Sequence, residues 1–86
     1  MSETAAAFAA AQVKIKSVTS LGNDALLELY AWYKQGTAGD VSGSRPGMLD
    51  IKGRAKFDAW AGKKGQSQAQ AQASYVALVE KLTRGK

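Results

Sequence analysis

Apolar residues in the first part of the chain recur at helical spacing. Residues 4–20 are rich in alanine and contain neither glycine nor proline, which gives this segment a high helix propensity. Phe8, Ile15 and Val18 fall at i, i+7 and i+10, so they share one face of the predicted helix. Leu21-Gly22 follows as a stop signal, and we expect Gly22 to occupy the left-handed position that ends a helix.

A second helix is predicted to begin at a cap formed by Asn23 or Asp24 and to end near residue 35 or 38. Its apolar residues cover more than one stripe of the helix surface; they are Leu26, Leu27, Leu29, Tyr30 and Tyr33. A helix with so wide an apolar surface either lies between two neighbours or offers one side to a ligand.

Residues 36–50 show no periodicity and contain four glycines and the only proline of the chain. A loop of this length without its own secondary structure is uncommon in a small domain and is often functional. The alternative interpretation is a spacer that carries the next helix across the molecule.

Two further helices are predicted after this loop. Asp50 is placed to cap a helix over residues 51–64, and Ser67 with Gln70 has the spacing of a capping box for the next one. The apolar residues of the fourth helix are Tyr75, Val76, Val79 and Leu82, which we expect to pack against the apolar face of the first helix. Four helices without a strand pattern predict an all-α bundle.

Composition and charge narrow the classes of function. The 86 residues include neither cysteine nor histidine, which excludes disulfides, thiolate metal sites and histidine-assisted nucleophiles. We therefore expect no enzymatic activity, no metal and no cofactor. Residues 1–43 carry three lysines against four acids, whereas residues 44–86 carry nine Lys or Arg against three acids. A basic half of this kind favours an anionic partner.

Tyrosines and lysines at helical spacing form the candidate binding site. Tyr30, Tyr33 and Lys34 lie on one face of the second helix, and Lys52 and Lys56 are one turn apart on the third. Like charges at that spacing repel, so an anion between them would explain the pair, although two lysines that extend into water are the alternative. No glycine-rich phosphate loop is present, so a nucleotide here would not be held by backbone amides.

The segment that holds these residues resembles the acyl-CoA-binding protein family. The resemblance is nearly gapless over residues 26–60 and covers about residues 8–82, within a chain that we interpret as a single domain, residues 1–86. It is carried by Leu29-Tyr30-Ala31-Trp32-Tyr33-Lys34-Gln35, by Arg45-Pro46-Gly47-Met48-Leu49-Asp50 and by Lys52-Gly53-Arg54-Ala55-Lys56-Phe57-Asp58-Ala59-Trp60.

This resemblance implies a four-helix bundle with up-down-down-up connectivity and a long loop between helices 2 and 3. Family members bind long-chain acyl-CoA thioesters without catalysis and act as intracellular carriers. By position, the residues that would hold the 3′-phosphate and adenine of CoA are Tyr30, Lys34 and Lys56. The other implied ligand contacts are Tyr33, Lys52, Tyr75 and Lys16, with Lys14 as the alternative to Lys16.

The fatty chain of such a ligand needs an apolar groove, and the second helix has more apolar surface than a single core contact requires. We expect the groove to be lined by Leu26 and Leu27, together with neighbouring residues of the first or third helix.

The remaining expectations concern partners and location. No apolar run approaches the roughly 18 residues needed to span a bilayer, and the N-terminal segment lacks the basic region of a signal peptide. We expect a cytoplasmic monomer with no nucleic-acid partner, no stable membrane insertion and transient contact with enzymes that use acyl-CoA. The alternatives are a basic module that binds nucleic acid, with steep salt dependence, and a bundle that binds membranes or proteins without competition from CoA.

Overall fold

Four α-helices and one 3₁₀ turn make up the computed structural model, which describes residues 3–84. In chain order the elements are α1 (Glu3–Lys14), η1 (Ile15–Ser17), α2 (Asn23–Thr37), α3 (Ile51–Ala61) and α4 (Gln68–Thr83). Within residues 3–84 there is no strand. The predicted all-α fold with four helices is therefore confirmed.

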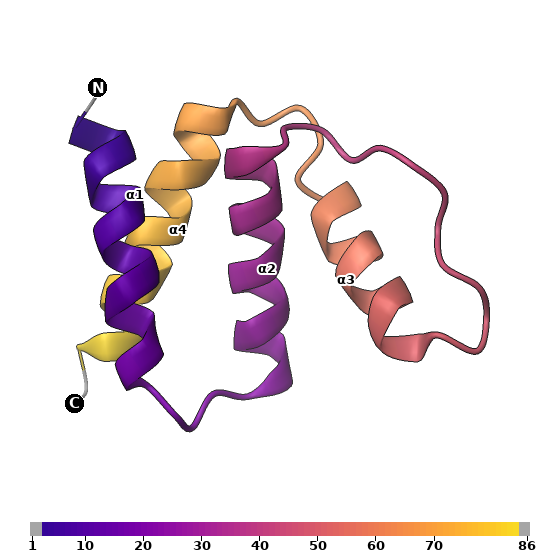
Figure 1. The fold of residues 1–86 in the computed structure, drawn as a ribbon, viewed down its shortest axis with the longest axis horizontal. Coiled ribbons are helices and arrows are strands. Elements are labelled where there is room, and N and C mark those ends of the chain that lie inside the picture. The colour runs from indigo at the N-terminus through magenta and orange to yellow at the C-terminus, as the bar shows by residue number, and fades with distance from the viewer. Residues whose placement is uncertain (1–2, 85–86) are drawn as a thin grey trace.

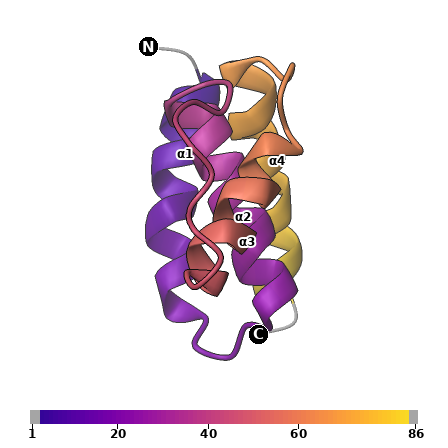
Figure 2. The ribbon, with the colours of Figure 1, turned by 90° about the vertical axis from the view of Figure 1, so that its right-hand side faces the viewer.

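The helices pack in a spatial order that differs from their order in the chain. α1 packs against α4, α4 against α2, and α2 against α3. In Figure 1, α1 and α4 run downward while α2 and α3 run upward, in keeping with the expected up-down-down-up order. The long loop passes along the outer side of α3 before that helix begins (Figure 2). The loop thus serves as the spacer that lets α2 and α3 run in the same direction.

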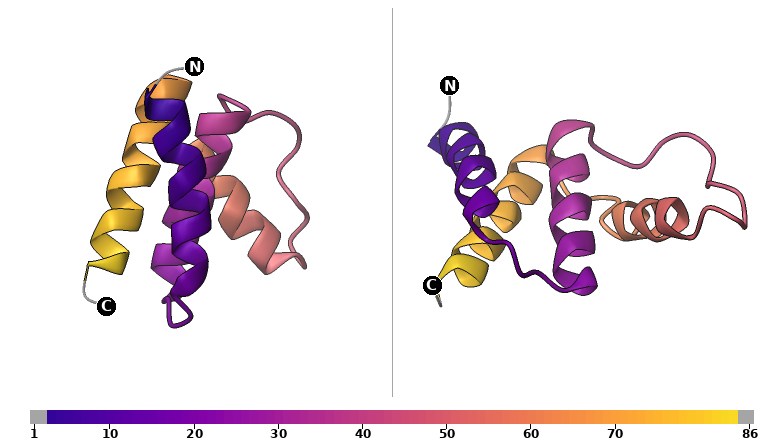
Figure 3. Two further views of the ribbon diagram at one scale, coloured as in Figure 1. Left: turned by 60° about the vertical axis from the view of Figure 1, so that its left-hand side comes forward. Right: turned by 60° about the horizontal axis from the view of Figure 1, so that its bottom comes forward.

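The bundle is flat because α3 stands apart from α1 and rests against α2 (Figure 3). The molecule measures 36 × 30 × 15 Å along its principal axes. Side chains at the α2–α3 contact consequently remain accessible, and both Lys52 and Lys56 are exposed.

The core joins α1, α2 and α4. Phe8 is buried with its ring at 5.1 Å and nearly perpendicular to the ring of Tyr75, and Val79 has no exposed surface. Partly buried residues that pack against this cluster include Ile15, Val76 and Leu82. The expected contact between the apolar faces of the first and fourth helices is confirmed, although Val18 is buried outside this cluster.

The first helix is shorter than predicted, because α1 ends at Lys14 rather than near residue 20. The chain tightens into η1, where the Val18 amide donates to the Ile15 carbonyl at 3.0 Å and Val18 itself is extended. The Ser17 hydroxyl donates to the Lys14 carbonyl at 2.8 Å. A hydroxyl that donates to this carbonyl competes with the backbone amide that would continue the helix, and the β-branched residues nearby favour extended backbone.

The expected left-handed conformation of Gly22 is also wrong, because its φ and ψ are −71° and 164°. Gly22 is instead the N-cap of α2, and its carbonyl accepts the first helical hydrogen bond, from the Leu26 amide at 3.1 Å. Asn23 and Asp24 lie inside the first turn. Glycine is tolerated at an N-cap, and an acid in the first turn complements the helix dipole, so this boundary moves by one residue at little cost.

Both predicted caps of the later helices are confirmed. The Asp50 carboxylate accepts from the Gly53 amide at 3.0 Å, and Ser67 and Gln70 form the reciprocal capping box at the start of α4. The third helix ends at Ala61 rather than residue 64. After Ala61 the backbone makes i→i−3 bonds and reaches Gly65 at a φ of +96°, so the lysines that precede Gly65 lie in a turn.

A polar junction around the buried Gln35 fixes the upper ends of α2 and α3 to each other. Gln35 is fully buried, and its Nε2 donates to Asp40 Oδ1 and to the Gln66 carbonyl, both at 2.8 Å. Asp40 Oδ1 also accepts from the Gly65 amide at 2.9 Å, and the Trp60 indole donates to the Gly39 carbonyl at 2.8 Å. These bonds tie the start of the long loop to the turn after α3, so they hold α3 against α2.

We expect this junction to weaken in acid. The Gly65 amide, helped by Gln35 and Lys64, holds the pKa of Asp40 below its usual value. Stability from a carboxyl with a lowered pKa is present above the unfolded pKa of about 4 and is lost as pH falls through the folded pKa. Asp40→Asn should therefore show a smaller loss of urea midpoint between about pH 5 and pH 2.5 than the wild type. Equal losses in the two proteins would contradict this assignment.

Candidate functional site

Two lysines rest on aromatic rings along the contact between α2 and α3. Lys56 Nζ of α3 lies 5.5 Å from the centre of the Tyr30 ring of α2, and Lys34 Nζ of α2 lies 4.8 Å from the Trp60 ring of α3. Each pair has the geometry of a cation–π contact and bridges the two helices in opposite directions. The structure therefore brings Tyr30, Lys34 and Lys56, which the family resemblance grouped together, to the contact between one pair of helices.

These lysines carry charge that no carboxylate compensates among the described residues. The two ion pairs found within residues 3–84 join Arg45 to Asp58 at 2.7 Å and Lys63 to Glu28 at 3.0 Å. Neither includes Lys34, Lys52 or Lys56. Since a ring face leaves the ammonium donors free, the α2–α3 face can offer them to an anion.

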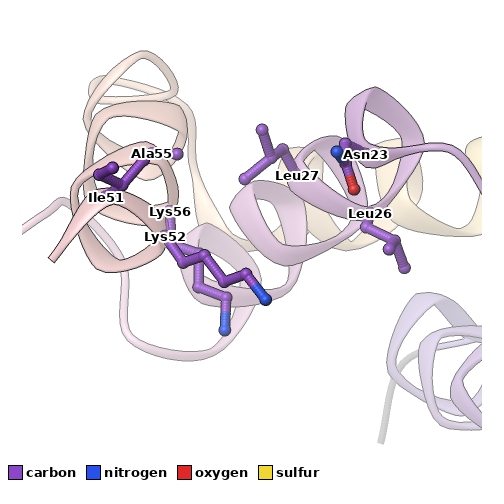
Figure 4. Close-up of a pocket in the computed structure, with 7 residues that line it drawn as sticks. All are labelled: Asn23, Leu26, Leu27, Ile51, Lys52, Ala55 and Lys56. Atoms are coloured by element: carbon purple, nitrogen blue, oxygen red, sulfur yellow. The ribbon is translucent and has the colours of Figure 1, made fainter.

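A groove of about 410 Å³ lies between the beginnings of α2 and α3. It is lined by Asn23, Leu26, Leu27, Ile51, Lys52, Ala55 and Lys56. In Figure 4, Leu27 projects from α2 toward α3, and the ammonium groups of Lys52 and Lys56 extend to one side. The groove combines an apolar wall with a basic rim, and it includes both leucines that the sequence singled out.

Tyr33 and Tyr75 meet on a different surface, where α2 faces α1 and α4. Their ring centres are 6.4 Å apart, and the centre of the Phe8 ring lies 6.0 Å from that of Tyr33 and 5.1 Å from that of Tyr75. Tyr33 is 38% exposed, whereas Tyr75 is only 5% exposed. Burial, with a smaller effect from Tyr33, raises the pKa of Tyr75, so this phenol is neutral and packs mainly in the core.

The basic residues at the end of α1 lie apart from these contacts. Lys14 is the last residue of α1 and Lys16 lies in η1, and both side chains are exposed. Neither lysine makes one of the cation–π contacts at the α2–α3 face, and neither lines the groove. The choice between them as a ligand contact stays a prediction.

A third lysine–ring pair has a structural explanation. Lys63 Nζ lies 4.2 Å from the Trp32 ring centre and also pairs with Glu28, and its side chain is largely buried. Because Glu28 compensates its charge, Lys63 anchors the turn after α3 to α2.

Several residues of the site could not be named from the sequence, although residues of the third helix were expected in the groove. Ile51 and Ala55 line the groove, and Trp60 supports Lys34. Helical spacing could have found them, since Ile51 and Ala55 are one turn apart beside the two lysines, and Trp60 follows Lys56 by four residues.

Two further observations concern only the described part of the chain. Within residues 3–84, no three His, Cys, Asp or Glu side chains gather in a way that could hold a metal ion. None of the described helices combines the length and apolar character needed to cross a membrane.

Comparison with known proteins gives one consistent result. Residues 5–79 match the family model for acyl-CoA-binding protein. An acyl-CoA-binding protein homolog 1 of Caenorhabditis elegans is 57% identical over 74 residues, which cover 86% of this chain and 85% of the relative. The acyl-CoA-binding protein of Saccharomyces cerevisiae is 47% identical over 73 residues, covering 80% of this chain and 84% of the relative.

Solved structures agree with the sequence matches. The crystal structure of acyl-CoA-binding protein 2 of Oryza sativa superposes with a TM-score of 0.92 at 35% identity, covering 95% of this chain and 90% of that one. The protein of the same type from Moniliophthora perniciosa gives a TM-score of 0.86 at 36% identity, covering 99% and 83% of the two chains. The chain belongs to the acyl-CoA-binding protein family.

Proposed function

We propose that this protein binds long-chain acyl-CoA thioesters without turning them over and carries them inside the cell. The observation that carries this proposal is the position of Lys56, which rests on the Tyr30 ring and also lines the apolar groove. A ligand with an anionic, aromatic head and an apolar tail would engage both features at once. The basic, aromatic face adjoins the apolar groove, just as the CoA head of the ligand is joined to its acyl chain.

The head of the ligand is assigned to the basic and aromatic residues of α2 and α3. Lys34 and Lys56 would bind the 3′-phosphate from two helices through charge-assisted hydrogen bonds, and Tyr30 offers a ring face to adenine. Lys52, at the rim of the groove, would meet the remaining phosphates. Further contacts are proposed for Tyr33, Tyr75 and Lys16, with Lys14 as the alternative to the last.

The acyl chain is assigned to the groove. Its volume of about 410 Å³ lies in the range typical of small-molecule sites, and Leu26 and Leu27 form its α2 wall. Leu26 is 49% exposed, so a fatty chain bound beside it would cover apolar surface that otherwise faces water. This gain is the physical reason to expect a preference for long chains.

We further propose a monomer in the cytoplasm that makes transient contact with enzymes that supply or use acyl-CoA. The absence of cysteine suits a reducing compartment.

Binding without turnover can be measured directly. Palmitoyl-CoA mixed with the protein should form a one-to-one complex in native mass spectrometry, because residues 3–84 offer a single face of this kind, between α2 and α3. A thiol assay should find no release of CoA above a protein-free blank, since no histidine or cysteine is available as a catalyst. Release of thiol in proportion to protein would refute the non-catalytic part of the proposal.

A further inference from the structure

The long loop ends in a tight turn whose two central residues are apolar. The Asp50 amide donates to the Gly47 carbonyl at 3.0 Å, which closes a four-residue turn around Met48 and Leu49. Met48 is 82% exposed and Leu49 is 99% exposed. Central turn positions usually carry Gly, Pro, Asn, Asp or Ser, so two large apolar side chains here are unusual.

The turn is held firmly, so these side chains project from a defined position. Asp50 closes the turn and also caps α3 through the Gly53 amide at 3.0 Å. Ile51, the first residue of α3, is 77% exposed. Together Met48, Leu49 and Ile51, which we call the apolar turn, present three adjacent large apolar residues that the core does not use. Three large apolar side chains exposed within four consecutive residues are a candidate interaction site.

The apolar turn lies at the basic end of the bundle. α1 and α4 end at this end of the molecule, and α2 and α3 begin there (Figure 1). Within residues 3–84, six cationic residues lie in the terminal turns or caps at this end; they are Lys14, Lys16, Lys52, Arg54, Lys81 and Arg84. The carboxylates there number three and are Asp24, Asp50 and Glu80, of which Asp50 is engaged as a helix cap.

We propose that this end of the bundle docks reversibly on an anionic lipid bilayer, with Met48 and Leu49 entering the interfacial region. An apolar tip beside an excess of cations complements a surface that is apolar just below a layer of negative headgroups. The insertion of two side chains from one turn is peripheral and weak, which suits a protein that must leave the surface again.

Docking would also orient the ligand groove. Ile51 belongs to both the apolar turn and the lining of the groove, so a docked molecule holds the mouth of the groove against the lipid. An acyl chain could then pass from bilayer to protein with little exposure to water. This second consequence rests on the proposed function, whereas docking itself requires no acyl-CoA.

The test is sedimentation of the wild type with ligand-free vesicles, either of phosphatidylcholine alone or with roughly one third phosphatidylserine. We expect binding to the anionic vesicles only, and weaker binding at high salt because the electrostatic part is screened. Met48→Ser with Leu49→Ser should lower the partition coefficient at least about tenfold. Val13→Ser is the matched control, because Val13 is 68% exposed in the last turn of α1, at the same end of the bundle but outside the apolar turn. It should change partitioning less than about twofold if Met48 and Leu49 are the side chains that insert.

Three outcomes would overturn docking by the turn: equal binding of the wild type to both kinds of vesicle, wild-type partitioning by the double variant, or an equal loss in Val13→Ser.

Titration of the double variant with acyl-CoA in the absence of vesicles separates this proposal from the proposed function. We expect wild-type affinity there. A double variant that loses acyl-CoA affinity but keeps vesicle binding would assign the turn to the ligand site and overturn docking. A wild type that docks but binds no acyl-CoA would support docking and refute the proposed function.

Discussion

Lys34→Ala and Lys56→Ala are each expected to weaken the binding of acyl-CoA roughly ten- to hundredfold. Each lysine would lose a charge-assisted hydrogen bond to the 3′-phosphate, worth about 1.5–3 kcal/mol. Both ammonium groups already lie at the α2–α3 contact, over Trp60 and Tyr30. Loss of either ring contact should cost only about 1 kcal/mol of stability, so the variants stay folded for titration calorimetry.

Three comparisons isolate the phosphate. The double variant should lose less affinity than the sum of the two single losses, because the lysines share one partner. Lys81→Ala is the control, since Lys81 is exposed near the end of α4 and lies outside the site. This variant should bind acyl-CoA with the affinity of the wild type. Esters of dephospho-CoA should bind the wild type more weakly and be almost indifferent to both substitutions. Lysine variants that still discriminate fully against the dephosphorylated ligand would show that the phosphate lies elsewhere.

Phe8→Ala is expected to lower the free energy of unfolding by about 3–5 kcal/mol. Phe8 is 6% exposed, and its ring contacts Tyr75 of α4 and Tyr33 of α2, so its removal leaves a cavity where three helices meet. A domain of ordinary stability has only about 5–15 kcal/mol to lose. The urea midpoint should fall steeply while the slope of the transition stays the same.

Val13→Ala provides the control for this experiment. Val13 belongs to the same helix and is 68% exposed, so its truncation should change the free energy of unfolding by no more than about 0.5 kcal/mol. Similar losses in the two variants would mean that Phe8 is not at the centre of the core.

The fold was largely predictable because its strongest signals are local. The carboxylate of Asp50 and the pair Ser67 and Gln70 cap their helices as the sequence indicated. The apolar repeat in α4 correctly identified the face that meets α1. Such signals act over three or four residues, and a single sequence displays them directly.

Helix ends were less predictable, since small competing terms decide them. α1 ends and η1 begins where the Ser17 hydroxyl donates to the Lys14 carbonyl, which a helical amide would otherwise use. Gly22 is the N-cap of α2 and does not adopt the left-handed conformation that ends a helix. The turn after Ala61 depends on Gly65 and on contacts from Gln35 and Asp40, which are far away in the sequence. No local pattern reveals a partner that lies 25 or more residues away.

The site was predictable in its residue types but not in its pairings. Helical spacing placed Tyr30 with Lys34, yet in space Tyr30 meets Lys56 and Lys34 meets Trp60. These pairings depend on how α3 is set against α2, and the hydrogen bonds of Gln35 help to fix that arrangement through residues distant in the sequence. The family resemblance placed Tyr75 at the binding face, and the structure buries most of it against Phe8.

Titration calorimetry with free CoA, a short-chain acyl-CoA and a long-chain acyl-CoA tests the central claim most directly. Because the basic α2–α3 face adjoins an apolar groove, affinity should rise from the first ligand to the last at a stoichiometry of one. Each methylene that the groove covers should add up to about 0.8 kcal/mol, until the groove is filled. A long-chain acyl-CoA that binds no more tightly than free CoA would contradict the assignment of the groove to the acyl chain.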